Sequence, residues 1–238
     1  MQPLAQNGGV LPVEQGLHEK KPIDRIEFLN AIFKEVKPSK DIAMLLGKKP
    51  EQLSAAEAKQ VLDWALDTKF TELEFYIRGL MALNGPFNPD AETTARDLIK
   101  AAVYYHEENH TVSEYFFQQS KLLLDKGLAA DPRNISLLNA LIVYQSEYEE
   151  APMQFLATLR KAQAIDSMNP ELNEIHFNLL KKSNQLEKAL SKCKKMLSLQ
   201  PQSENWLFKT SEVYGLMGDS TNSRIFLNLG VKARKRNN

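Results

Sequence analysis

The stretch NPELNEIHFNLLKKSNQLEKALSKCKKMLSLQPQSENWLFKTSEVYGLMG, from Asn169 to Gly218, decides the fold of this chain. It predicts an amphipathic helix, a short turn, a second helix, a Gln-Pro break and a third helix. The two breaking prolines, Pro170 and Pro201, stand 31 positions apart. Two short helices between regularly spaced prolines are typical of a helical repeat, which offers a curved surface to something else.

The helical period continues outward from this stretch in both directions. Ser39 is a predicted N-cap, Ser54 with Glu57 forms a predicted capping box, and the Asn84-Gly85-Pro86 run closes a helix. Apolar residues at three- and four-residue spacing predict further helices over residues 23–37, 39–47, 54–69, 71–85, 87–110, 111–131, 134–150, 152–167 and 219–236. No segment alternates long enough to predict a strand, so we expect about ten to twelve helices and an all-α fold.

The chain divides into three predicted parts. Residues 1–22 are rich in Pro, Gly and Gln without a period, which predicts a flexible N-terminal tail. Residues 23–86 form an N-terminal helical region, and residues 87–236 form the repeat array. Their tight turns favour stacked helix pairs over a bundle with long crossovers.

Composition excludes several classes of protein. One cysteine, Cys193, allows neither an intrachain disulfide nor a cysteine-based zinc cluster. The N-terminus lacks the pattern of a secretory signal, and no apolar run reaches the length of a membrane span. We therefore expect a cytoplasmic protein, or a periplasmic one if a signal segment has been removed.

Charge is unevenly distributed although the formal net charge is zero. Residues 101–150 hold eight acidic and three basic side chains, whereas residues 181–238 hold four acidic and twelve basic ones. The middle of the chain is acidic and its C-terminal part basic. Such asymmetry affects partner choice and steering, not the fold.

The chain resembles the tetratricopeptide-repeat (TPR) family over residues 90–236 and, more distantly, over residues 23–86. The family's closing proline, small crossing residues, aromatic position and turn are matched by Pro201, Ala157, Ala162, Ala189, Tyr214 and Gly218-Asp219. The family's Gly after the first helix's large apolar residue is missing, and the breaking prolines are spaced 43, 38 and 31 residues apart. The resemblance implies antiparallel helix-pair repeats that form a right-handed TPR-like superhelix.

By this resemblance the protein would be a non-enzymatic scaffold, an adaptor or a chaperone-like module. Family members typically hold a peptide or a helix in a concave groove lined by the first helix of each pair. The corresponding partner-binding residues here are Asn139, Val143, Glu174, Asn178, Lys181, Phe208 and Glu212. Glu174 stands where the family's carboxylate clamp has a lysine, so we do not expect that clamp. The partner would be a protein or peptide, and a homo-oligomer is possible.

Residues 106–110 read HEENH, a literal H-E-x-x-H. On one helix, histidines four apart share a face and can bind zinc with the glutamate as general base. The third ligand of a catalytic zinc is missing downstream, and the motif falls just before a turn. We therefore expect no metal, no cofactor and no catalytic residue, with a zinc-dependent hydrolase as an alternative.

Two further clusters allow a structural and a functional interpretation. Tyr104, Tyr105, Tyr115, Phe116 and Phe117 either pack between helices or leave an exposed hydrophobic anchor. The basic residues around Lys181–Lys195 and Lys232–Arg236 are either a solvated face or a site for nucleic acid or another anionic ligand. No aromatic residue lies among the lysines, so we expect no nucleic acid. Cys193 is predicted to face the core.

Overall fold

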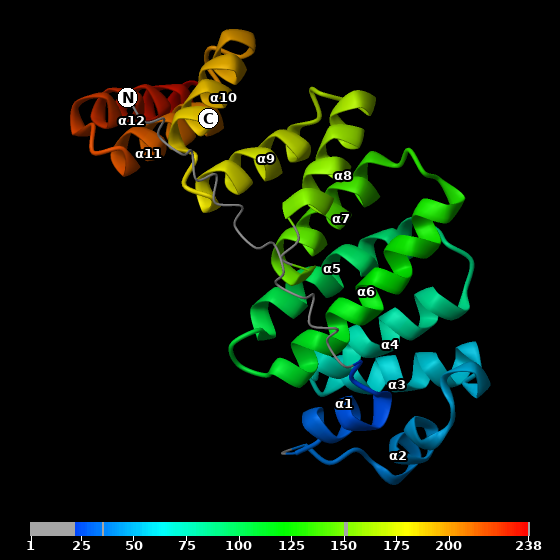
Figure 1. Cartoon of the computed structure of the whole chain (residues 1–238). Coiled ribbons are helices and arrows are strands. Elements are labelled where there is room, and N and C mark those ends of the chain that lie inside the picture. Colours follow the sequence, from blue (N-terminus) through cyan, green and yellow to red (C-terminus); the bar gives the residue numbers. More distant parts are fainter. Residues whose placement is uncertain (1–21, 35, 150–151, 238) are drawn as a thin grey trace, which may run out of the picture.

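The computed structural model describes residues 22–34, 36–149 and 152–237, and within these ranges the regular structure is helical without any strand. Figure 1 shows the helices as an elongated, bent array that runs from α1 at one end to α12 at the other. The elements are α1 (Arg25–Ile32), α2 (Lys40–Gly47), a 3-10 turn η1 (Pro50–Gln52), α3 (Ala55–Asp67), α4 (Thr71–Asn84), α5 (Pro89–Tyr105), α6 (His110–Ala130), α7 (Ile135–Tyr144), a π-helical turn η2 (Gln145–Glu149), α8 (Pro152–Ile165), α9 (Pro170–Lys182), α10 (Leu186–Leu199), α11 (Glu204–Leu216) and α12 (Ser220–Asn237). The all-α prediction is confirmed, while most of the predicted tail lies outside the described residues.

Local sequence signals explain where many of these helices begin. The capping box of Ser54 and Glu57 is present at the start of α3. Asn88, Asn109, Asn134 and Asn169 cap α5, α6, α7 and α9, and each side-chain oxygen accepts a hydrogen bond from the backbone N–H three residues later, at 2.9–3.2 Å. Each cap satisfies one of the N–H groups that a helix start leaves unpaired.

Consecutive helices form antiparallel pairs: α3 with α4, α5 with α6, α7 with α8, α9 with α10, and α11 with α12. Three of the tight turns use a backbone with positive φ, at Lys69 (55°), Asn184 (54°) and Gly218 (81°). Neighbouring pairs then stack through α4 on α5, α6 on α7 and α10 on α11. The molecule is therefore a row of helix hairpins, as the proline spacing predicts.

The apolar interior is divided into three clusters along this row. The largest extends from Phe28 to Tyr144, the second from Leu138 to Leu172, and the third from Phe177 to Val213. The first cluster crosses residues 86–87 without interruption, because α4 packs on both α5 and α6. The division into residues 23–86 and 87–236 therefore stays a prediction from the sequence.

A polar network joins the first helices of successive pairs. The guanidinium of Arg96 on α5 donates to Ser136 Oγ on α7 at 3.0 Å and forms an ion pair with Glu171 on α9. Asn139 on α7 donates to Glu171 Oε2 at 3.1 Å and to the cap oxygen of Asn169 at 3.1 Å. The start of α9, which bridges the larger body and α10–α12 in Figure 1, is thereby fixed to α5 and α7.

Two predicted helices differ in length from the structure. The helix predicted over 23–37 is regular only to Ile32. The helix predicted over 134–150 is regular to Tyr144 and then widens into the π-helical turn η2. A π turn displaces the side chains that follow it, and it places Glu147 beside the C-terminal end of α9, where its carboxylate contacts Lys182.

Candidate functional site

Two adjoining depressions lie at the C-terminal ends of the first helices α5, α9 and α11. Their volumes are about 490 and 440 Å³, and both are lined by Lys182. We call them together the end surface, which is lined by Val103, Tyr104, His106, Glu107, Glu108, Phe117, Glu147, Lys181, Lys182, Asn184, Leu186, Glu212 and Leu216. Because these residues come from three separate helix pairs and from η2, the end surface depends on the stacking of the array.

Exposed apolar side chains lie at the two ends of the end surface, on α5 and on α11. Tyr104 is 65 % exposed, Val103 43 % and Leu216 54 %. By contrast, Tyr115, Phe116 and Phe117 are buried, so the dense aromatic set divides into core residues and one exposed ring. Tyr104 stands edge-on to the half-buried Tyr105 at 5.0 Å between ring centroids, which restricts its orientation.

Charged side chains occupy the region between these apolar residues. Lys182 Nζ lies 2.9 Å from Glu147 Oε2, and Lys181 Nζ lies 2.6 Å from Glu212 Oε1. Both lysines stand in the last turn of α9, where the helix dipole favours cations. Glu107 and Glu108 add two exposed carboxylates without a balancing lysine in the lining, so the end surface is acidic.

The predicted partner-binding residues do not all share one environment. Lys181 and Glu212 form the ion pair of the end surface, and Asn178 is exposed on α9. Glu174, one turn before Asn178, accepts a hydrogen bond from Asn205 on α11 and lies 3.6 Å from Lys209 Nζ. These contacts place the exposed side chains of α9 and α11 on one face of the array.

The other three predicted residues have packing contacts. Asn139 is 1 % exposed, and its amide belongs to the network at the start of α9, so it lines no open surface in this structure. Val143 is half-buried against the largest core cluster. The Arg234 guanidinium lies over the ring of Phe208, 4.9 Å from its centroid, and Phe208 packs against Gly230. The role of all seven residues in binding stays a prediction.

Sequence reasoning missed Glu147, Lys182 and Leu216 as members of the candidate site. Lys182 follows Lys181 directly, and helix periodicity alone places the two on different faces. They converge here because the end of α9 is approached from one side by η2 and from the other by α11. No signal within a single helix indicates this meeting of elements.

The HEENH motif spans a turn rather than a helix face. His106 follows the last residue of α5 and His110 begins α6, with 6.4 Å between the ring centroids and both side chains exposed. Within the described part of the chain, no three His, Cys, Asp or Glu side chains are grouped so as to hold a metal ion. The geometry supplies no third ligand for the zinc-hydrolase alternative.

The remaining candidate residues have structural surroundings. Cys193 is fully buried, and burial raises the pKa of its thiol to about 11, which removes thiolate character. Several basic residues of the C-terminal part are neutralised locally, since Lys181, Lys182 and Arg234 each pair with a glutamate. These pairs reduce the positive charge available to a nucleic acid.

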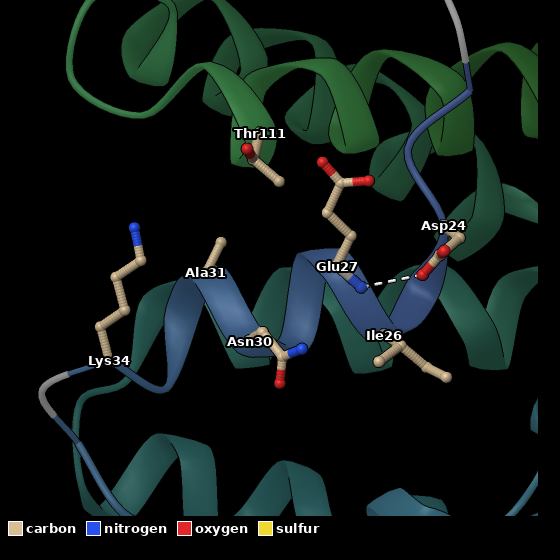
Figure 2. Close-up of a pocket in the computed structure, with 7 residues that line it drawn as sticks. All are labelled: Asp24, Ile26, Glu27, Asn30, Ala31, Lys34 and Thr111. Atoms are coloured by element: carbon tan, nitrogen blue, oxygen red, sulfur yellow. Dashed lines mark hydrogen bonds between the residues drawn. The ribbon is translucent and has the colours of Figure 1, made fainter.

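A further open depression of about 470 Å³ lies between α1 and the start of α6. Figure 2 shows the side chains of Glu27 and Thr111 directed into this space, with Lys34 at one limit. Asp24 is used locally, because its carboxylate accepts a hydrogen bond from the Glu27 backbone at 2.8 Å as the cap of α1.

Comparison with known proteins gives a weak structural likeness. No protein-family model and no curated protein matches the chain. A solved structure titled "MamA MSR-1 C2" aligns with a TM-score of 0.44 and 14 % identity, covering 76 % of this chain and 95 % of that chain. A likeness of this size assigns neither a family nor a function.

None of the described helices combines the length and the apolar character needed to cross a bilayer. On α12, Ile225, Leu227, Leu229 and Val231 are each 40–49 % exposed. Nothing else in the structure identifies what would cover them, so the homo-oligomer stays a prediction.

Proposed function

We propose that this protein is a non-enzymatic scaffold that binds a polypeptide segment across the end surface and the adjoining exposed face of α9 and α11. The observation that carries the proposal is the convergence of exposed Tyr104, the two lysines of α9 and exposed Leu216 from separate helix pairs. Exposed apolar residues around a charged centre are typical of protein-binding surfaces.

The chemistry of the end surface favours a particular kind of segment. Tyrosine is enriched among residues that dominate binding energy, because its ring buries a large area with few rotatable bonds. The exposed Glu107 and Glu108 favour a segment that carries basic residues near its apolar anchor. We therefore propose a partner segment with an apolar side chain against Tyr104 and a lysine or arginine facing the turn between α5 and α6.

Adaptor and chaperone-like roles both fit a surface of this kind. They differ in how selective the surface is, since an adaptor holds one partner and a chaperone many. The ion pairs of Lys181 and Lys182 restrict the geometry of the centre, which supports selectivity and hence the adaptor role.

Site-specific photocrosslinking tests the location of the surface. A benzophenone amino acid replaces Tyr104, and a control replaces Met153, which is 79 % exposed on α8. In cells that contain the native partner, we expect a defined adduct from position 104 and none of the same mass from position 153. Equal adducts from both positions, or none from position 104, would contradict the proposal.

The dissociation constants of variants for the partner identified in this way test the contributions of Tyr104, Asn178 and Lys181. Tyr104→Ala is expected to weaken binding about 30-fold, the effect of removing a side chain worth about 2 kcal/mol. Asn178→Ala with Lys181→Ala tests the predicted residues of α9. Asn228→Ala with Lys232→Ala changes exposed residues of the same types on α12 and serves as the control. If all three variants bind as the wild type does, the end surface is not the binding site.

A further inference from the structure

A separate pocket, which shares no lining residue with the end surface, lies between α8, α9 and α10. It occupies about 420 Å³, within the range of sites for small molecules. Three lysines, Lys188, Lys192 and Lys195, line it together with Gln163 of α8 and His176 of α9. Its lining contains no aspartate or glutamate, although the whole chain has equal numbers of acidic and basic residues. We call it the lysine pocket.

The lysines reach this pocket through the period of α10. Positions 188, 192 and 195 are separated by four and three residues, so they share one face of the helix. The adjacent face carries Ala189 and Cys193, which are fully buried in the cluster with residues of α9 and α11. Packing of the apolar face therefore fixes the side of α10 from which the three lysines project.

Lys192 is half-buried and lacks an anionic partner. Its Nζ donates a hydrogen bond to Asn173 Oδ1 at 2.7 Å, which is a neutral amide oxygen. None of the three lysines forms an ion pair with a described residue. Burial, reinforced by the nearby charge of Lys195, lowers the pKa of Lys192 to about 8. A cation removed from water without a counter-charge is costly, and a bound anion would remove that cost.

The opposite wall of the pocket supplies a neutral donor. Burial, followed by the charge of Lys192, lowers the pKa of His176 to about 4, so the imidazole is neutral at pH 7. Gln163 Nε2 lies 3.1 Å from His176 Nδ1. An amide N–H donating to Nδ1 leaves the proton on Nε2, which is then a hydrogen-bond donor. Ser167 and Ser191 add hydroxyl groups to the lining.

We propose that the lysine pocket binds a phosphate monoester dianion, with Lys192 and Lys195 as its cationic contacts and His176 as a neutral donor. A phosphate group offers three acceptor oxygens and close to two negative charges at pH 7, which suits several converging donors. This site is separate from the end surface and does not depend on the proposed function.

Calorimetric titration with phenyl phosphate tests the site, at constant ionic strength of about 0.15 M to screen non-specific attraction. We expect saturable binding of one ligand per chain, and no binding of phenol. Lys195→Gln and Lys192→Gln should each weaken binding about ten-fold, the effect of losing one charged hydrogen bond. Lys194→Gln removes the same charge from an exposed position of α10 outside the pocket and should change affinity less than about two-fold.

The pH dependence provides an independent readout. Phenyl phosphate stays a dianion above about pH 7, so the affinity should fall between pH 7 and pH 9.5 as Lys192 loses its proton. The groups that face Lys192 are Asn173 and His176 of α9, Gln163 of α8, and Lys188 and Lys195 of α10. In Lys192→Gln, the affinity for phenyl phosphate should lose most of this pH dependence.

A lipid arm distinguishes the source of the phosphate. Vesicles of phosphatidylcholine with phosphatidic acid are sedimented with wild-type protein, Lys195→Gln and Lys194→Gln. Pocket-dependent sedimentation would indicate a lipid headgroup, and pocket-dependent binding of phenyl phosphate alone would indicate a soluble ester. Absence of binding in both arms, or an equal loss in Lys194→Gln and Lys195→Gln, would overturn the proposal. Lys195 is exposed, so its variant remains informative even if Lys192→Gln fails to fold.

Discussion

Arg96→Met tests whether the polar network at the start of α9 holds the two ends of the array in position. The substitution keeps an unbranched apolar stem but removes the hydrogen bond to Ser136 and the ion pair with Glu171. The hydrogen bond from the partly exposed guanidinium to a hydroxyl contributes about 1 kcal/mol, and the half-exposed ion pair about 0.5–1 kcal/mol after screening by solvent. We therefore expect the free energy of unfolding of the segment that contains α9 to fall by about 2 kcal/mol.

Hydrogen exchange measured by mass spectrometry on peptides from α9 is the direct assay, because the loss is expected to be local. Protection should fall in α9 and in the helices beyond it, and remain unchanged in α3 and α4. Arg160→Met removes an exposed arginine from α8 and serves as the matched control. A double-mutant cycle of Arg96→Met with Glu171→Gln should show coupling of about 0.5–1 kcal/mol. Equal effects of Arg96→Met and Arg160→Met, or strict additivity in the cycle, would refute the reasoning.

Three further predictions concern stability and reactivity. Gly127→Ala should lower the midpoint of urea unfolding, because a Cβ there would lie 2.4 Å from Phe87 Cζ. Gly79→Ala should raise the midpoint, because the nearest atom to its Cβ would be at an ordinary 3.5 Å and alanine favours helix. A Gly127→Ala variant as stable as Gly79→Ala would contradict this reasoning. Since the pKa of His176 is lowered to about 4, its contribution to stability is fully present above about pH 6.5 and is lost as the pH falls toward 4. His176→Gln should therefore flatten the pH dependence of unfolding in that window, and an unchanged slope would count against it. The Cys193 thiol, with its pKa raised to about 11 by burial, should react with a thiol reagent at pH 8 only as fast as the protein opens, so rapid labelling of the folded protein would show the burial to be wrong.

Local features of the fold could be predicted from the sequence. Ser39, and Ser54 with Glu57, specify helix starts through contacts within four residues, and both caps appear in the structure as predicted. The buried face of α6, with Phe116 and Leu124, follows from the helical period alone. Information of this kind is contained in a single helix and needs no knowledge of its neighbours.

The candidate site was less accessible to prediction because it is formed by several helix pairs. Asn139 is polar and lies on a first helix, but its amide turns toward α9 and is buried there. Tyr104 and Tyr115 belong to one aromatic cluster in the sequence, yet one is exposed and the other is in the core. Whether such a side chain is buried or exposed depends on how its helix is rotated about its axis relative to helices about 30 residues away in the sequence. The apolar period of a single helix does not specify that rotation.

The separation of the interior into three apolar clusters has a consequence for how the molecule responds to heat and denaturant. Neighbouring clusters share buried residues of a single helix, α7 between the first two and α9 between the last two, so the third cluster can be lost while most of the first remains packed. Melting should begin at α11 and α12, which close the cluster at the C-terminal end of the array, and advance toward the aromatic-rich end. Calorimetry would then record a broad, multi-step endotherm in place of a single cooperative peak.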